Sequence, residues 1–146
     1  MKNVLKIVLF AVLMVSCKQK IVPADVAKLN GYWEIEKVDL ADGADKNYKL
    51  NENFDYFEMK GNQGFRKKVK PQLDGTFIAN DTYENVKVRF EKEKVFLDSS
   101  TDFAKWTEEL VTLTDDELVI KNDENKVYHY KKTEAINLTG NGEKTK

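Results

Sequence analysis

Most of the chain between residues 32 and 132 consists of short β-like runs joined by very short connections. The connections are mostly two to five residues long and are rich in Gly, Asn and Asp, as at Gly61–Gly64, Asp74-Gly75 and Asn122–Asn125. Such connections suit antiparallel hairpins and leave no room for crossover helices. We therefore predict nine strands, over Tyr32–Asp39, Phe54–Lys60, Phe65–Lys70, Thr76–Asn80, Glu84–Glu91, Lys94–Asp98, Trp106–Leu113, Glu117–Asn122 and Lys126–Lys132.

Several of these runs alternate between apolar and polar residues. Trp33 and Ile35, for example, point away from Glu34 and Glu36. A meander of short strands must bury one face and hide its edges, and closure into an up-and-down barrel does both. The pattern predicts an all-β, antiparallel barrel of eight or nine strands. Phe103, Trp106 and Leu110 are also spaced like a helical stripe, so a helical turn within Phe103–Leu110 is an open alternative to a strand.

The N-terminus has the features of a secretory signal. Lys2 and Lys6 precede nine apolar residues, Ile7–Val15, and the small Ser16 follows. The apolar run is too short to cross a bilayer as a helix, which takes about 20 residues. We predict a signal peptide at 1–16, a tether with a short helical turn at 17–28, the barrel at 29–134 and a flexible C-terminal tail at 135–146. Pro23 and Asp25 suit the start of that helical turn.

Leu13-Met14-Val15-Ser16-Cys17 resembles a bacterial lipobox, with Met14 where the usual pattern has Leu. The resemblance implies cleavage before Cys17 and acylation of Cys17, for instance with palmitate, and two or more acyl chains hold a protein stably on a membrane. Cys17 is the only Cys in the chain; the alternative is a Cys placed there by chance. Lys18 is not the Asp that retains some lipoproteins in the inner membrane, and no acidic run follows Cys17. By resemblance, we expect an outer-membrane lipoprotein facing the periplasm.

Gly31-Tyr32-Trp33 opens the predicted meander and is similar to the Gly-x-Trp motif of the lipocalins. Lipocalins usually stack an Arg of the last strand on this Trp, and here the last strand offers Lys131 and Lys132. The resemblance covers about residues 29–132. It implies a lipocalin-like barrel in which Gly31 and Trp33 close one end, and it implies binding of a small apolar or amphiphilic ligand.

Four residues are candidates for contact with such a ligand: Tyr56, Phe65, Lys67 and Phe90. Lys67 shares a strand face with Phe65, so it could hold an anionic head group if that face lines the barrel. The alternatives are that these aromatic side chains only fill a small barrel, and that the basic run Arg66–Lys70 is a solvated edge strand.

The net charge and the counts of Cys and His exclude several classes of function. A net charge of −1 lacks the basic excess of nucleic-acid-binding proteins. One Cys and one His leave no disulfide and no multi-histidine metal centre, and we identify no cofactor, metal or catalytic residue. His129 lies between two Tyr without a nearby base partner, and the acidic turns Asp115–Glu117 and Asp123–Asn125 lack the spacing of a calcium loop. We expect that this protein is not an enzyme. The alternative to ligand binding is a plugged barrel that binds a protein partner, as an inhibitor or immunity-type factor would.

Overall fold

The computed structural model describes residues 19–48 and 51–134. The predicted signal peptide, Cys17 and the predicted tail 135–146 lie outside them. Within these ranges the chain forms one 3-10 helix and ten strands. Their bounds are η1 Pro23–Leu29, β1 Gly31–Asp39, β2 Asp45–Asn47, β3 Phe54–Lys60, β4 Gln63–Pro71, β5 Phe77–Ala79, β6 Glu84–Glu91, β7 Lys94–Ser100, β8 Lys105–Leu113, β9 Glu117–Lys121 and β10 Val127–Thr133.

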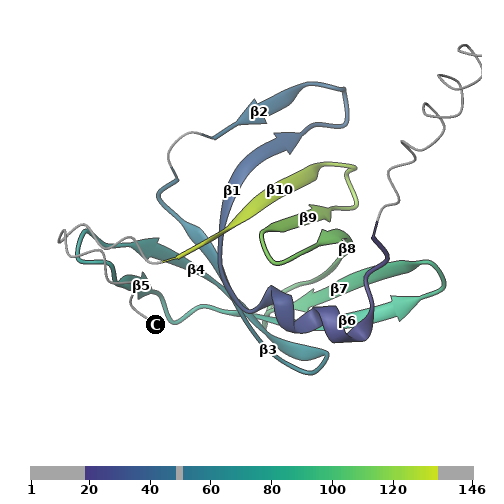
Figure 1. The fold of residues 1–146 in the computed structure, drawn as a ribbon, viewed down its shortest axis with the longest axis horizontal. Helices are drawn as coiled ribbons and strands as arrows, with labels where there is room; N and C mark the ends of the chain where they lie inside the picture. The colour runs from purple at the N-terminus through teal and green to yellow at the C-terminus, as the bar shows by residue number, and fades with distance from the viewer. Residues whose placement is uncertain (1–18, 49–50, 135–146) are drawn as a thin grey trace, which may run out of the picture.

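Eight strands form a closed antiparallel barrel (Figure 1). The order around the barrel is β1-β3-β4-β6-β7-β8-β9-β10, and β10 pairs back onto β1, with Glu34 opposite Lys131. Strand β2 extends the sheet from β1, and β5 extends it from β4. The predicted all-β barrel of eight or nine strands is therefore confirmed.

All nine predicted strands are present, and two of them, Phe54–Lys60 and Glu84–Glu91, have the predicted bounds. The sequence did not predict β2, because Asp45-Lys46-Asn47 is short, polar and exposed on every residue. The helical alternative for Phe103–Leu110 is wrong, since β8 begins at Lys105 and Phe103 is 98% exposed in the preceding turn.

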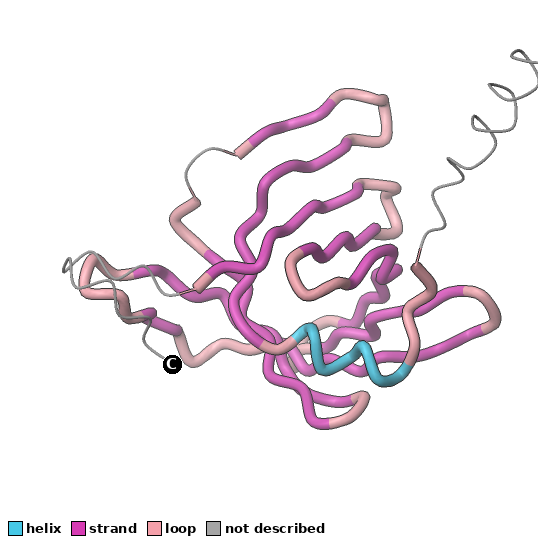
Figure 2. Tube along the Cα trace, viewed as in Figure 1, coloured by secondary structure: helices cyan, strands magenta, loops and turns pink. Residues whose placement is uncertain are grey.

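Helix η1 closes one end of the barrel (Figure 2). Pro23 stands at its start, as predicted, and the Asp25 carboxylate accepts a hydrogen bond from the Val22 N–H at 2.9 Å. Ile21, Val26 and Leu29 are all buried in the core. The packed fold thus begins by Ile21, within the segment predicted to be a tether.

Trp33 packs at this closed end and is fully buried. Its Nε1–H donates to the Leu29 carbonyl at 2.7 Å, and Nζ of Lys132 lies 4.7 Å from the centre of its ring system. The same ammonium donates to the Lys28 carbonyl at 2.7 Å, and burial lowers the pKa of Lys132. Gly31 has φ +114°, and a Cβ there would lie 3.1 Å from Cε of Lys132. Lys132 thus covers the indole at the position where the resemblance implied a basic residue.

Candidate functional site

The end of the barrel opposite η1 carries ionisable side chains that face the interior. The C-terminal end of β3 lies by the helix, where the Met59 N–H donates to Asn30 at 2.6 Å. Asp55, near the start of β3, lies farther from the helix along that strand and opposite Trp33 in the register, and we call the part of the barrel on that side the mouth. Interior-facing polar side chains gather there from five strands. We call this set the mouth cluster, and it comprises Asp55, Arg66, Lys68, Glu84, Glu108 and Tyr130.

Arg66 is the centre of the mouth cluster and is only 8% exposed. Its Nε lies 2.6 Å from Oε2 of Glu84, and its Nη2 lies 3.3 Å from Oε2 of Glu108. Since β4 and β8 are not neighbours in the barrel, the contact with Glu108 crosses the interior. Burial by itself would lower the pKa of Arg66, but the carboxylates of Glu108, Asp55 and Glu84 outweigh it and raise that pKa. The guanidinium thus stays charged and bridges opposite walls.

Asp55 forms the second half of the cluster and is 2% exposed. Its Oδ1 lies 2.5 Å from Nζ of the more exposed Lys68. Tyr130 is buried beside it, and burial first, then the Asp55 charge, holds the pKa of the phenol well above its ordinary value. Tyr130 therefore remains a neutral hydroxyl in the site.

The mouth cluster has more hydrogen-bond acceptors than donors. Three carboxylates face two cations, which leaves one negative charge in excess. Within the described ranges, Asp55 Oδ1 and Glu108 Oε2 have ion-pair contacts without hydrogen-bond geometry, and Ser99 Oγ has no partner at all. Buried polar atoms are nearly always satisfied in proteins, so these acceptors favour a bound hydrogen-bond donor.

Three partly buried apolar side chains, which we call the apolar rim, lie beside residues of the mouth cluster in the sheet. Trp106 of β8 lies opposite Ser99 in the strand register and is half-buried. Ile35 and Tyr128 are partly buried and pack against the core from β1 and β10. An apolar rim around a polar floor is suited to a molecule with one apolar part and one hydrogen-bonding part.

Three of the four residues predicted to contact a ligand lie on the outside of the barrel. Arg66 points inward, so its neighbours Phe65 and Lys67 point outward, and Tyr56 lies opposite Lys67. They cannot line an interior cup, as the ligand hypothesis assumed. The physical reason is that Arg66 finds carboxylates across the barrel, whereas Phe65 and Lys67 find aromatic partners outside it.

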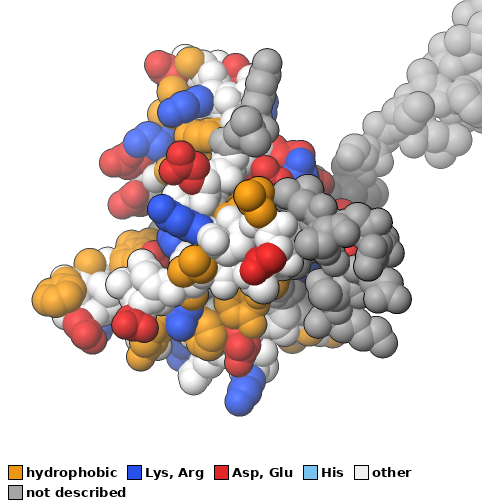
Figure 3. Space-filling model, turned by 90° about the vertical axis from the view of Figure 1, so that its left-hand side faces the viewer, with side chains coloured by type: hydrophobic (Ala, Val, Ile, Leu, Met, Phe, Trp, Pro, Cys, Tyr) orange, Lys and Arg blue, Asp and Glu red, His pale blue; other side chains and the backbone are white. Residues whose placement is uncertain are grey.

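These outer residues belong to a chain of aromatic rings, which we call the outer aromatic strip. Successive ring centroids are 4.0–6.2 Å apart along the strip. Nζ of Lys67 lies 5.4 Å from the ring of Phe65 and 5.8 Å from that of Tyr83. Figure 3 views the β4–β5 side, where hydrophobic side chains gather with Lys and Arg among them. In order, the strip runs Phe54, Phe77, Tyr32, Tyr56, Phe65 and Tyr83.

Phe90, the fourth predicted residue, is separate from both sites. It lines a pocket of about 310 Å³ between the N-terminal segment and the β6–β7 hairpin, together with Ile21, Val95 and Leu110. The structure therefore does not bring the four candidates together. Asp55 was not among the predicted site residues, although it shares a strand face with Phe57 and Met59, a signal that places it inward.

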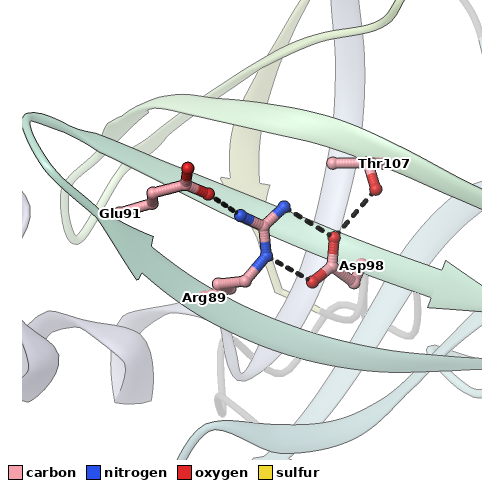
Figure 4. A network of polar contacts seen from close by, with 4 residues as sticks. All are labelled: Arg89, Glu91, Asp98 and Thr107. Atoms are coloured by element: carbon pink, nitrogen blue, oxygen red, sulfur yellow. Dashed lines mark hydrogen bonds and ion pairs between the residues drawn. The ribbon is translucent and has the colours of Figure 1, made fainter.

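Polar networks also lie on the outer surface. The Arg89 Nε donates to Asp98 at 2.8 Å, Thr107 donates to the same carboxylate at 2.8 Å, and Glu91 also pairs with Arg89 (Figure 4). His129 lies 2.7 Å from Asp39, a carboxylate partner that was not predicted because it comes from β1.

In the described ranges, no three His, Cys, Asp or Glu side chains are grouped to hold a metal ion. No described helix is both long and apolar enough to span a membrane.

Comparison with known proteins shows that this chain matches one sequence family and is similar to two solved structures. The sequence family described as a lipocalin-like domain matches residues 29–120. A lipocalin-like protein from Bacteroides uniformis has a similar structure, with a TM-score of 0.48 and 14% identity over 73% of this chain and 99% of that one. A protein from Bacteroides eggerthii gives a TM-score of 0.46 and 11% identity over 72% of this chain and 99% of that one. No curated protein matches this chain.

Proposed function

Because this chain belongs to the lipocalin-like domain family, whose barrel is a ligand-binding scaffold, we propose that it is a lipid-anchored binding protein of the cell envelope and not an enzyme. Its ligand is a small amphiphilic molecule held at the barrel mouth. The observation that carries this proposal is the buried mouth cluster beside the apolar rim, in which two ion-paired carboxylate oxygens, Asp55 Oδ1 and Glu108 Oε2, have no hydrogen-bond partner.

The apolar rim fits the apolar part of the proposed ligand, and the mouth cluster fits its hydrogen-bonding part. The closed end and the middle of the barrel are filled, since Trp33, Phe57 and Leu97 are at most 1% exposed. The ligand is therefore shallow, with its apolar part against Trp106 and its hydrogen-bonding part toward Glu108. Displacing water from the apolar rim stabilises the complex by about 25 cal/mol per Å² of apolar surface buried.

Native mass spectrometry of the protein purified from its own envelope tests this proposal. We expect a retained small-molecule mass that is reduced in Trp106→Ala and in Glu108→Gln. Leu73→Ala and Glu109→Gln are the matched controls, because Leu73 is 79% exposed on a distant turn and Glu109 points outward to Lys94. A clean protein mass for the parent, or equal loss of ligand from the controls, contradicts the proposal.

We further propose that the acyl anchor is on Cys17 and that the barrel faces the periplasm from the outer membrane. The buried Ile21 supports a short anchor, because only three residues separate it from Cys17 and they span at most about 14 Å when extended. Added protease should leave the barrel intact in whole cells and cut it after outer-membrane permeabilisation. Efficient cutting on intact cells would instead place the barrel outside.

The outer aromatic strip supports a second candidate function, binding of a protein partner on the barrel surface. Aromatic side chains are enriched in protein interfaces, and the strip exposes half of Tyr83 beside Lys67. The double variant Phe65→Ser/Tyr83→Ser should then lose a protein that co-purifies with the parent while keeping any small-molecule mass. Loss of the small-molecule mass instead would favour the strip as the ligand site.

A further inference from the structure

A second concave site lies outside the barrel, between the segment before β6 and the β7–β8 turn. Its volume is about 320 Å³, and its lining includes Asp81, Tyr83, Asn85, Thr101, Asp102 and Phe103. We call it the Tyr83–Phe103 pocket. It shares no residue with the mouth cluster, so it is independent of the ligand-binding function proposed above, although Tyr83 also belongs to the outer aromatic strip.

Two aromatic rings line this pocket while remaining exposed. Tyr83 is 50% exposed, and Phe103 is 98% exposed. The turn that carries Phe103 has a defined shape, because Oγ1 of Thr101 accepts hydrogen bonds from the N–H groups of Phe103 at 3.3 Å and Ala104 at 3.2 Å. These hydrogen bonds fix the backbone of the turn, and the Phe103 ring is in solvent, where a ligand can reach it.

The charged side chains that line the pocket are all acidic. Asp81 and Asp102 line it, and no Lys or Arg does. Among the described residues, neither carboxylate has an ion-pair partner or a hydrogen bond. Nζ of Lys67 lies 5.8 Å from the ring centre of Tyr83, and Lys67 is not part of the lining. The pocket therefore combines negative charge with accessible aromatic faces.

We propose that the Tyr83–Phe103 pocket binds an organic ammonium group, such as the trimethylammonium of choline. The faces of aromatic rings attract cations, and a bulky ammonium is also apolar enough to displace water from both rings. The carboxylates supply the long-range attraction. A small inorganic cation holds its hydration shell and gains less from the rings, and a ligand without charge gains less from the two carboxylates. Nζ of Lys67 already lies over one face of Tyr83, 5.8 Å from the ring centre, so the ammonium is expected at the open faces of Tyr83 and Phe103.

A titration with choline chloride, followed by ¹H–¹⁵N NMR on the chain from residue 18 to 146, tests the proposal. We expect saturable shifts, in the millimolar range, for the amides of residues 81–83 and 101–104. The neutral isostere 3,3-dimethylbutan-1-ol should bind at least about threefold more weakly, since it lacks the charge. Asp102→Asn and Phe103→Ala should each weaken choline binding by about two- to fivefold, whereas the exposed controls Asp123→Asn and Leu73→Ala should not.

Several results would overturn the proposal. They are the absence of saturable shifts, equal affinity for choline and its neutral isostere, or unchanged choline affinity in Phe103→Ala. Saturable binding of N-acetylglucosamine without choline binding would identify a sugar site instead. Co-sedimentation with phosphatidylcholine vesicles distinguishes the source of the ammonium: binding that Phe103→Ala weakens indicates a lipid head group, and choline binding without vesicle binding indicates a free amine.

Discussion

Replacing Trp33 by Ala tests the closed end of the barrel. The side chain is fully buried in the core cluster, which also includes Leu29, Met59 and Leu118, and its Nε1–H donates to the Leu29 carbonyl at 2.7 Å. Removing a buried Trp costs about 3–5 kcal/mol through lost burial and the cavity left behind. The orphaned Leu29 carbonyl adds about 1 kcal/mol. Because domains of this size are stable by about 5–15 kcal/mol, Trp33→Ala should leave the barrel marginally folded.

Urea unfolding followed by circular dichroism measures this loss, on the chain that starts at residue 18. In thermal unfolding, the melting temperature should fall by roughly 12–30 °C, since each kcal/mol shifts it by about 3–5 °C in a domain of this length. Trp106→Ala is the matched control, because Trp106 is half-buried at the mouth, and it should cost about 1 kcal/mol.

Trp33→Phe separates packing from hydrogen bonding. It keeps a ring in the core but removes the Nε1–H donor. The free energy of unfolding should therefore lie between those of the parent and Trp33→Ala. A loss below about 1 kcal/mol for Trp33→Ala, or a loss equal to that of Trp106→Ala, would refute the argument that Trp33 closes the barrel.

Three further predictions concern other parts of the chain. Gly64→Ala should cost about 3 kcal/mol in urea unfolding, because a Cβ there would lie 2.0 Å from the Glu58 carbonyl oxygen; Gly43→Ala, where nothing lies within 4 Å, should cost about 1 kcal/mol, from its φ of +86° alone. Arg89 and then Thr107 lower the pKa of Asp98 from its ordinary 3.8, so this carboxylate stabilises the fold above that pH and loses its effect as the pH falls. Asp98→Asn should therefore cost about 0.5 kcal/mol at pH 7 and nothing near pH 2, and an equal cost at both pH values would contradict the pairing. Cys17→Ser should abolish labelling by a radioactive or alkyne-tagged fatty acid and leave either precursor or a soluble exported form; membrane fractionation of a fully processed variant would contradict the lipobox interpretation.

The local sequence pattern was sufficient to predict nine of the ten described strands. Alternation and turn residues placed Phe54–Lys60 and Glu84–Glu91 with their observed bounds, because each strand buries one side of its own sequence. Antiparallel pairing followed from connections too short for a crossover. The three-residue β2 carried no such signal, since its side chains are all exposed and it is a strand only through its hydrogen bonds to β1.

The inward face of β4 was not determined by local pattern. Alternation places Phe65 and Lys67 on one face and Arg66 on the other, but it does not say which face is interior. By hydrophobicity, Phe65 was the better candidate for the inside. The tertiary structure reversed this choice, because closure brings Glu108 of β8 within 3.3 Å of Arg66 across the barrel.

The positions of the candidate sites therefore depended on contacts between residues far apart in sequence. The mouth cluster joins carboxylates from β3, β6 and β8 to cations from β4, and each of these strands alone looks like an ordinary amphipathic strand. The aromatic side chains of the strip lie on the outer wall, with Phe54 buried there, because they pack with Phe77 and Tyr83, from β5 and the segment after it. The sequence alone determined the strands and their faces, whereas only closure of the barrel decided which faces enclose charge and which face solvent.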